Sequence, residues 1–375
     1  MKASNGKKVL ISGASFAGLA SAYFLSELGY AVTLVEIHSG LRLGGTAVNI
    51  QGSTVDVIAR MGLLDAIRAN RLDLQRFEMK DSEDRTVRTL PLRAPGEPQP
   101  EDEFEIERDA LIQLLFDAVR GRAELVFADR ITTIDERPEG LAVTFERGAP
   151  RTFDLLLGCD GLHSGVRKLW FGQEARFVHS LQQYFSITIV DKLLIERNTA
   201  QLFNVPCKAV MLNAYKNKTD IIFNFAPETE LVYDYRDEAQ QRKIIREQFA
   251  FVGWRAAELL REIEGSTSFY FDELCQVRMP QWSKGRVALV GDAGYCASPA
   301  AGRGGSLALD GAAALANALR AHSDDHARAF REYDEKLRPF SDEIQMAAAR
   351  TAIETLVPRT EEAIRARNAR TDAGF

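Results

Sequence analysis

The sequence has few cysteines and no concentrated run of basic residues. Its four cysteines lie far apart among 375 residues and form no CxxC pair, which disfavours a zinc site or a disulfide framework and fits a reducing, cytoplasmic compartment. Lysine and arginine total 47 against 53 acidic residues, a formal net charge of −6. Because nucleic-acid binders need a concentrated basic face for phosphates, that class of protein is disfavoured.

Long hydrophobic runs are scarce as well. The stretch Val9–Ser26 carries no charge and follows two lysines, as a signal peptide or a short membrane span would. Serines and glycines interrupt it, and it divides into a strand-like half and a helix-like half. We therefore predict that it belongs to a folded domain and does not span a membrane.

Common motifs of metal and nucleophile chemistry are also missing. The five histidines form no HExxH pair and no GxSxG sequence is present, so we predict no metal site. The apolar share of 46% and the charged share of 27% are those of an ordinary globular chain. The length predicts about two domains.

A glycine-rich loop near the beginning predicts a dinucleotide site. Residues 13–18 read Gly-Ala-Ser-Phe-Ala-Gly, between a predicted strand at Val9–Ile11 and a predicted helix at Gly18–Leu28. The pattern is GxGxxG with Ser15 at the second glycine. The first glycine allows a tight turn, the third allows close helix–strand packing, and pyrophosphate binds N–H groups at the helix start. Serine is small, so this departure weakens the motif without excluding it.

An acidic residue follows at the separation typical of such sites. The predicted strand Ala31–Val35 leads into Glu36, 23 residues after Gly13. An acid about 20 residues after the loop typically holds the adenosine ribose hydroxyls. The same residues are compatible with an ordinary glycine-rich turn and a surface glutamate, and the motif alone does not separate NAD from FAD.

Two later segments bring further charged residues toward a ligand. Arg108 lies in the first turn of a predicted helix, where a cation is unfavourable unless an anion offsets its charge, although a solvated arginine fits the spacing equally well. A predicted β-meander over residues 124–159 leads into an Asp160-Gly161 turn, which in isolation is an ordinary turn signal.

The third later segment combines a buried strand with a second glycine-rich loop. The strand delivers Asp292 to a strand end, where ligands bind in α/β sheets. The loop Pro299–Gly305 then opens an apolar helix, whose first N–H groups have no internal partners and can meet an anion.

These stretches resemble the class A flavoprotein aromatic hydroxylases, the p-hydroxybenzoate hydroxylase-like FAD monooxygenases. They look nearest to the short bacterial members that include tetracycline-inactivating monooxygenases. The resemblance spans most of the chain, and five regions carry it: the 13–18 loop with Glu36, the Arg42-Leu43-Gly44-Gly45 turn, Arg108, Asp160-Gly161 with Arg167, and Gly291-Asp292 with Pro299–Gly304.

The resemblance implies FAD as cofactor and NADPH or NADH as a transient electron donor. It implies that Arg167 takes part in binding the reduced nicotinamide and that Gln51 and Pro299 lie near the flavin ring. Gly294-Tyr295 departs from the alanine and histidine that the family often shows. The implied FAD contacts are Gly13, Ser15, Phe16, Ala17, Gly18, Glu36, Arg42, Arg108, Asp160, Asp292, Pro299, Gly302, Gly304 and Gly305.

The implied fold is α/β: a Rossmann-like FAD-binding domain, with a mostly parallel sheet and a β-meander, an inserted antiparallel-sheet substrate domain, and C-terminal helices. The proline-rich segment 81–103 is expected to pass over the active-site face. The expected division is 1–78, 104–172 and 276–325 for the FAD-binding domain, 79–103 and 173–275 for the substrate domain, and 326–375 for the C-terminal helices.

Substrate contacts are expected from the inserted sheet, whose β-rich runs fall between residues 182 and 225. Each polar or aromatic candidate there is more typical of a half-buried strand residue than of a ligand contact. Gln51 is the best single candidate, because in relatives its segment passes the flavin ring. The sheet candidates are Tyr184, Phe203, Asn204, Asn213, Tyr215 and Asn224.

The resemblance implies a monooxygenase reaction. Reduced nicotinamide would reduce FAD, O₂ would add to give a flavin C4a-hydroperoxide, and its distal oxygen would hydroxylate an aromatic, polyketide-like or other polycyclic small molecule. The chemistry is borne by the flavin, so no protein residue is assigned as catalytic. A reductase or dehydrogenase of the same fold and a non-catalytic flavin-binding or ligand-binding protein are the alternatives, and no motif indicates the oligomeric state.

Overall fold

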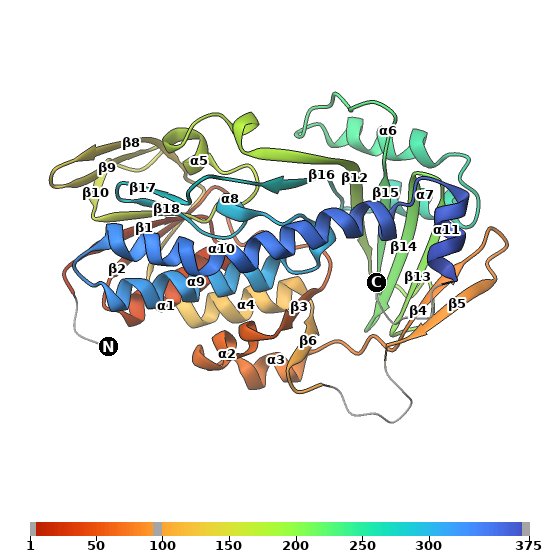
Figure 1. Ribbon diagram of the computed structural model, residues 1–375, viewed down its shortest axis with the longest axis horizontal. Coiled ribbons are helices and arrows are strands. Elements are labelled where there is room, and N and C mark those ends of the chain that lie inside the picture. Colours follow the sequence, from red (N-terminus) through yellow and green to blue (C-terminus); the bar gives the residue numbers. More distant parts are fainter. Residues whose placement is uncertain (1–4, 93–99, 370–375) are drawn as a thin grey trace.

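The computed structural model describes residues 5–92 and 100–369. Pro95 and Pro98 of the predicted proline-rich segment, and residues 370–375 of the predicted C-terminal helices, lie outside the described residues. Two large β-sheets lie at opposite ends of the molecule, each with helices on one face, and a long helix near the C-terminus runs along both (Figure 1).

The first large sheet has six strands in the order β17-β18-β11-β1-β2-β7, all parallel to their neighbours except β17. Val9, Leu10 and Ile11 of β1 are wholly buried, as expected for a parallel strand covered on both faces. The strands are β1 (Lys8–Ser12), β2 (Ala31–Glu36), β7 (Glu124–Phe127), β11 (Leu155–Gly158), β17 (Ser283–Lys284) and β18 (Val287–Leu289).

Helices cover one face of this sheet and a small antiparallel sheet covers the other (Figure 1). Helix α1 (Phe16–Glu27) packs against α4 (Arg108–Val119) and α9 (Gly304–Ala321), and α9 packs against α10 (His326–Thr351). The small sheet consists of β8 (Ile131–Arg137), β9 (Gly140–Phe145) and β10 (Arg151–Phe153).

The predicted meander over 124–159 is divided between two sheets. Its first run, β7, pairs with β2 in the parallel sheet instead of with β8. Its last run is interrupted at Asp154, whose Oδ2 accepts a hydrogen bond of 2.6 Å from the Lys8 backbone N–H. The Asp154 N–H donates in turn to the Lys8 carbonyl at 2.8 Å. At these two bonds the chain leaves the small sheet and enters β11. The meander therefore consists of β8 to β10, which is shorter than predicted.

The second large sheet has seven strands in the order β16-β12-β15-β14-β13-β4-β5. All neighbours are antiparallel except β13 and β4. It therefore extends the predicted 182–225 sheet with strands from before and after that segment. Its strands are β4 (Arg76–Lys80), β5 (Thr86–Pro91), β12 (Val178–Val190), β13 (Thr199–Val205), β14 (Lys208–Tyr215), β15 (Lys218–Phe225) and β16 (Tyr270–Val277).

The described part of the 81–103 segment does not cross a face of this sheet. Strand β5 pairs with β4 alone and forms the edge of the sheet. The cause is the tight turn at 81–85, where the Asp81 carboxylate accepts bonds of 2.9 Å from the N–H groups of Glu83 and Arg85. This turn returns the chain alongside β4.

The two faces of the seven-stranded sheet have different surroundings. Helices α6 (Glu238–Phe249) and α7 (Ala256–Gly265) cover the face that we call the outer face. Every second residue of β15 packs into the core beneath them, including Ile221, Phe223 and Phe225. Because side chains alternate along a strand, the intervening residues lie on the opposite, inner face.

The inner face turns toward the glycine-rich segments of the chain. Phe185 lies there, since its neighbour Tyr184 packs in the outer core. Phe185 forms a cluster with Leu274 and Ala352, and Ala300 of the loop before α9 packs against that cluster. The inner face and the second glycine-rich loop are therefore in direct contact.

Shorter elements complete the fold. Strands β3 (Val48–Gln51) and β6 (Glu103–Ile106) form a two-stranded antiparallel sheet. No described helix is long and apolar enough to cross a membrane. The remaining helices are α2 (Ser53–Arg60), α3 (Leu64–Asn70), α5 (Gly165–Trp170), α8 (Asp292–Tyr295) and α11 (Glu361–Asn368), with the short turns η1 (Glu174–Arg176), η2 (Pro299–Ala301) and the π-helical η3 (Ala352–Leu356).

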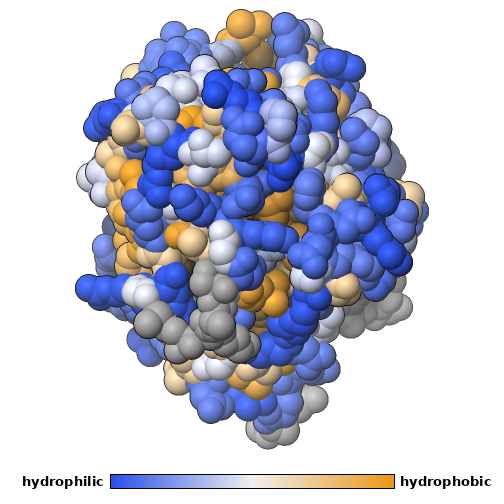
Figure 2. Space-filling view, turned by 90° about the vertical axis from the view of Figure 1, so that its left-hand side faces the viewer, coloured by the Kyte–Doolittle hydropathy of each residue, from blue (hydrophilic) through white to orange (hydrophobic). Residues whose placement is uncertain are grey.

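The C-terminal helices connect the two large sheets. Helix α10 begins beside the six-stranded sheet, and η3 and α11 reach the seven-stranded one (Figure 1). The buried Arg367 side chain donates to Asn204 Oδ1 of β13 at 2.8 Å and to the Thr355 carbonyl at 2.7 Å. Seen from the end formed by the six-stranded sheet, polar side chains cover most of the surface, with apolar residues between them (Figure 2).

The packing of α9 on an aromatic group predicts a steric effect at Gly311. A Cβ atom there would lie 1.8 Å from Tyr295 Oη, which is fixed 2.9 Å from Tyr333 Oη. We expect Gly311→Ala to lower the free energy of unfolding by about 1–3 kcal/mol, the usual cost of overpacking a core, in spite of the better helix propensity of alanine. Urea unfolding measures this change.

Gly265→Ala in α7 is the matched control, because no atom lies within 4 Å of the added methyl group. We expect this variant to be as stable as the parent or more so. Equal stability of the two alanine variants would contradict the described packing of α9.

Candidate functional site

The first glycine-rich loop is held at the carboxyl ends of neighbouring strands. Gly13 has φ +103°, and a Cβ atom there would lie 2.5 Å from the Cys159 carbonyl oxygen at the end of β11. A Cβ atom at Gly18 would lie 1.8 Å from the Gly13 carbonyl oxygen. Both glycines are therefore required by close backbone approach, as the motif predicts.

The start of α1 is open to an anion. Ser15 occupies the N-cap position, but its side chain makes no capping hydrogen bond, and no acidic residue lies in the first turn. The N–H groups of this turn thus remain for a ligand, and the helix dipole favours a negative one. Phe16 and Ala17, the next predicted contacts, form the first turn itself.

Glu36 reaches back to the same loop from the end of β2. Its Oε2 accepts a hydrogen bond of 2.8 Å from the Ala14 N–H, and its Oε1 accepts one of 2.9 Å from the His38 N–H. Each carboxylate oxygen can accept a second bond, so ribose hydroxyls can bind the same group. The loop and the acid, 23 residues apart in the sequence, meet in space.

Two arginines lie beside this loop. Arg108 Nη1 donates to the carbonyl oxygens of Arg42 at 2.9 Å and Gly44 at 2.8 Å, and its guanidinium lies 5.5 Å from the centre of the Phe16 ring. Burial, followed by repulsion from Arg42, lowers the pKa of Arg108. Two neighbouring cations at a helix start are stabilised by a bound anion such as a pyrophosphate.

The Asp160-Gly161 turn joins β11 to α5. Asp160 Oδ2 accepts bonds from the Val166 N–H at 3.0 Å and from Ser12 Oγ at 3.4 Å. Burial raises the pKa of Asp160, while the hydrogen bond from Ser164 opposes that rise. The carboxylate thus fixes the turn next to the first glycine loop.

Arg167 is buried, whereas its predicted role in binding the reduced nicotinamide suggests an accessible side chain. The side chain is 0% exposed, and its guanidinium donates to the carbonyl oxygens of Ala293, at 2.9 Å, and Leu162. It links the Asp160-Gly161 turn to α8. A direct contact with nicotinamide would require Arg167 to leave both carbonyls, so that role stays a prediction.

The last segment closes the site from the other side. Asp292 begins α8 directly after Gly291, which has φ +70° and whose added Cβ would lie 3.0 Å from Ala17 Cβ. Burial raises the pKa of Asp292, and attraction to Arg108 opposes the rise. This acid therefore lies close to the α1 start and to the arginine pair.

The starts of α1 and α9 meet. A Cβ atom at Gly305 would lie 3.4 Å from Phe16 Cε2, and Gly302, with φ +62°, ends the turn that Pro299 begins. Gly304 is the first residue of α9, which has neither a side-chain cap nor an acid in its first turn. Two open helix starts, the arginine pair and two buried acids thus surround one place, which fits a dinucleotide with a pyrophosphate and an anionic ring.

Comparison with known proteins agrees with this geometry. The family model described as the FAD binding domain matches residues 7–348. An uncharacterized protein of Mycobacterium tuberculosis is 41% identical over 338 residues, which cover 89% of this chain and 90% of that protein. A flavin-dependent monooxygenase of an unknown prokaryotic organism is 35% identical over 338 residues, 89% of this chain and 86% of that one. The crystal structure of tetracycline destructase Tet(51) has a TM-score of 0.85 at 33% identity, covering 96% of this chain and 94% of that chain.

The chain belongs to the FAD-binding family of class A flavin monooxygenases. It is an oxidoreductase, an FAD-dependent monooxygenase, and FAD is its cofactor. The predicted resemblance and the predicted α/β fold with an inserted antiparallel sheet are confirmed.

The predicted substrate residues of the inserted sheet divide between its faces. Tyr184 stacks against Phe225 in the outer core, with ring centres 5.7 Å apart, and Phe203 stacks on Trp254 at 5.6 Å. Both point away from the flavin site. Their aromatic character reflects core packing under α6 and α7, the structural alternative that the sequence left open.

The other four sheet candidates, Asn204, Asn213, Tyr215 and Asn224, lie on the inner face. Asn204 is used structurally, because its Nδ2 donates to the Leu356 carbonyl at 2.9 Å. Tyr215 Oη donates to Asp220 Oδ1 at 2.8 Å. Asn213 Oδ1 and Asn224 Oδ1 are buried with no hydrogen-bond partner among the described residues. Gln51, on β3, pairs with Glu103 and is partly exposed.

Sequence reasoning missed three polar residues near this face: Glu105, Tyr270 and Asp272. Arg42 lies 5.2 Å from the Tyr270 ring centre, and Tyr270 Oη donates to Asp272 Oδ2 at 2.6 Å. Burial raises the pKa of Glu105 to about 7. The alternation of acidic and apolar residues in 103–106 is the signal that could have found Glu105, whereas residues 270–275 show no such alternation.

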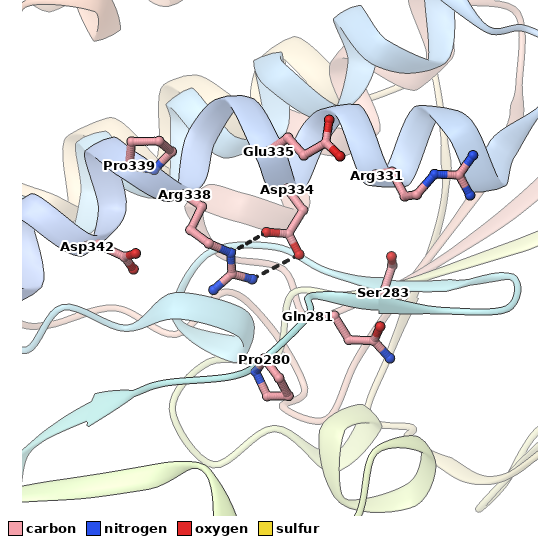
Figure 3. Close-up of a pocket in the computed structure, with 9 residues that line it drawn as sticks. All are labelled: Pro280, Gln281, Ser283, Arg331, Asp334, Glu335, Arg338, Pro339 and Asp342. Atoms are coloured by element: carbon pink, nitrogen blue, oxygen red, sulfur yellow. Dashed lines mark hydrogen bonds and ion pairs between the residues drawn. The ribbon is translucent and has the colours of Figure 1, made fainter.

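A pronounced surface pocket lies elsewhere and is not part of this site. It measures about 580 Å³ and lies between α10 and residues 280–283 (Figure 3). Two of its charged groups pair with each other: Arg338 Nε lies 2.6 Å from Asp334 Oδ1, and the guanidinium stacks 4.4 Å from the Trp282 ring centre. No residue of the glycine-rich loops lines it.

The contact between Gly18 and Gly13 predicts the effect of a single methyl group on cofactor binding. We expect Gly18→Ala to reduce bound FAD at least about tenfold, because the loop must move to admit the Cβ atom and the pyrophosphate then loses its N–H partners. The absorbance of purified protein and its titration with FAD measure this.

Gly40→Ala is the control for that experiment, since no atom lies within 4 Å of its added methyl group and Gly40 lies outside the loop. We expect this variant to bind FAD as the parent does. Retention of parent affinity by Gly18→Ala would contradict the assignment of the loop.

The ion pairs of His163, which lies in the Asp160-Gly161 turn, predict a pH-dependent contribution of this residue to the free energy of unfolding. Asp272, whose Oδ2 lies 3.7 Å from Nε2, and Glu174, whose Oε1 lies 2.8 Å from Nδ1, raise the pKa of His163 to about 9. The contribution is fully present below the unfolded pKa of about 6.5 and is lost as the pH rises through the folded value.

We therefore expect His163→Gln to lower the Tm most near pH 6 and to match the parent above about pH 9. The effect is modest, because the side chain is 49% exposed and solvent screens its ion pairs. His179→Gln is the control, as His179 is exposed and forms no ion pair with a described residue. A Tm difference that is constant between pH 6 and pH 9.5 would show that His163 acts without its charge.

Proposed function

We propose that this flavoenzyme uses NADH or NADPH and O₂ to hydroxylate an aromatic or polyketide-like small molecule. The observation that carries the proposal is the convergence of the α1 and α9 starts next to the inner face of the seven-stranded sheet. A bound flavin there supplies the redox and oxygen chemistry. The protein then contributes binding, orientation and exclusion of water.

The residues around the ring position have distinct tasks in this proposal. The open N–H groups at the start of α9 stabilise negative charge on the ring. The turn beginning at Pro299 shapes the adjacent wall, with Ala300 packed against Phe185 and Leu274. These apolar contacts keep water away from the side on which the substrate binds.

The substrate class rests on the inner face and on the relatives. Apolar side chains alternate there with the amides of Asn213 and Asn224, a composition typical of small-molecule sites. Tet(51), at 33% identity over 96% of this chain, is a tetracycline destructase. A fused-ring substrate with several polar groups is consistent with both observations.

A cytoplasmic location is part of the same proposal. All four cysteines are free thiols, three of them buried. A fold that uses no disulfide suits a reducing compartment.

The proposed reaction predicts coupled consumption of two cosubstrates. We expect purified holoenzyme to oxidise NADPH or NADH faster when a hydroxylated polycycle is added, with equimolar O₂ uptake. Hydrogen peroxide should account for only a minor part of the O₂ consumed, because a true substrate receives the oxygen. An oxygen electrode, nicotinamide absorbance and a peroxide assay measure the three quantities.

Two outcomes would favour an alternative function over the monooxygenase reaction. Equal substrate conversion without O₂ would identify a reductase or dehydrogenase of the same fold. Failure of both nicotinamides to reduce the bound FAD, across the ligand panel, would favour a non-catalytic flavin-binding protein.

A further inference from the structure

The inner face of the seven-stranded sheet holds buried oxygen atoms that have no hydrogen-bond partner among the described residues. Asp220 is 0% exposed and its Oδ2 accepts no hydrogen bond from any described residue. Asn224 is 7% exposed, and its Oδ1 is likewise unpaired. Buried polar atoms in native proteins are almost always paired, so unpaired ones at a proposed binding site point to a ligand.

These atoms lie on one face because of strand register. Asp220 and Asn224 alternate with Ile221 and Phe223, which pack in the outer core. Asp220 pairs with Asn213 on β14, whose Oδ1 is also unpaired. Three acceptor groups from two neighbouring strands therefore face the same side.

A second carboxylate faces them from another element. Glu105 lies on β6, and its charge is among the causes that raise the pKa of Asp220, after burial. Burial raises the pKa of each acid to about 7. Two acids from separate sheets are thus close enough to interact through a poorly solvated space.

The neighbouring cations do not neutralise this pair. The ammonium groups of Lys216 and Lys218 both bind Glu107, the latter at 3.1 Å. Neither Asp220 nor Glu105 forms an ion pair with a Lys, Arg or His in the part of the chain that the structure describes, and the weaker attraction of Lys218 leaves the pKa of Asp220 raised. Above this raised pKa of about 7, as at pH 8, the local charge is therefore negative, which repels carboxylates and attracts hydrogen-bond donors.

The same place borders the flavin loop. Asn49, the register partner of Glu105, has its Nδ2 atom 3.8 Å from where a Cβ atom at Gly302 would lie. Phe185, the register partner of Asn224, belongs to the cluster that contacts Ala300. A molecule bound to the acids and amides would therefore lie beside the turn that holds the ring.

We infer that Asp220, Asn224 and Glu105 select the substrate by its hydrogen-bond donors. The preferred substrate is a neutral or cationic fused-ring molecule with hydroxyl or ammonium groups, and aromatic carboxylates are rejected. This inference rests on the proposed function and specifies its substrate class. Asn213 supplies a further amide to the same donors.

Binding to the oxidised holoenzyme tests the inference without turnover. Two anthraquinones serve as probes: 2,3-bis(hydroxymethyl)anthraquinone, the dihydroxy probe, whose two alcohol groups stay neutral donors at pH 8, and anthraquinone-2-carboxylate, which carries a negative charge. Each is titrated at pH 8 while the flavin absorbance and fluorescence are followed. We expect the dihydroxy probe to bind at least about tenfold more tightly, since one hydrogen bond to a charged group has this effect.

Substitution of the acids should reverse the preference. We expect Asp220→Asn and Glu105→Gln each to weaken the dihydroxy probe about tenfold and to improve binding of the carboxylate probe. Both variants remove an acid, buried at Asp220 and half-buried at Glu105, and retain its shape, and their FAD content and Tm verify folding. Asp191→Asn, an exposed acid just beyond the end of β12, is the control and should leave both affinities unchanged.

The outcomes separate this inference from the proposed function. Equal or tighter binding of the carboxylate probe by the parent, or unchanged affinities in both variants, would overturn the inference. Efficient oxygenation of an aromatic carboxylate would overturn it as well while upholding the monooxygenase reaction. The expected binding preference without any oxygenation of bound ligands would uphold it and reject the proposed reaction.

Discussion

The close approach of Gly18 to the Gly13 carbonyl is the constraint on which the rest of the site depends. Because no side chain separates them, the start of α1 lies directly against the carboxyl ends of β1 and β11. Glu36, Arg108 and Asp292 then reach the same place from three other elements. A single methyl group at this contact would displace the surface to which all of these side chains are directed.

The cofactor half could be predicted from the sequence because its determinants are local. The glycines, the N-cap position and Glu36 lie within one strand–helix–strand unit, whose geometry follows from spacing alone. The predicted meander was only partly correct, since the bonds between Asp154 and Lys8 join residues 146 positions apart. Arg167 shows the same limit: the family resemblance implied a nicotinamide contact, whereas burial against Ala293 depends on the folded chain.

The substrate half could not be predicted to the same depth. Side chains alternate between the two faces of a sheet, and the sequence does not show which set lies on the inner face. Tyr184 and Phe203 are aromatic and plausible as ligand contacts, yet both lie on the helix-covered face. Asp220 and Glu105 come from strands in different sheets, and their mutual repulsion exists only after folding. The sequence predicted polar and aromatic contacts on this sheet, whereas the structure brings two acids together at its inner face, and this difference bears on the proposed substrate class.

The origin of the oxygen atom in the product tests the central claim most directly. Holoenzyme would be supplied with NADPH, hydroxylated polycycles and O₂ enriched in a heavy oxygen isotope, and the products would be analysed by mass spectrometry. A flavin monooxygenase with the site described here incorporates one labelled oxygen atom per hydroxylated product. A product whose new hydroxyl group carries unlabelled oxygen would contradict the account.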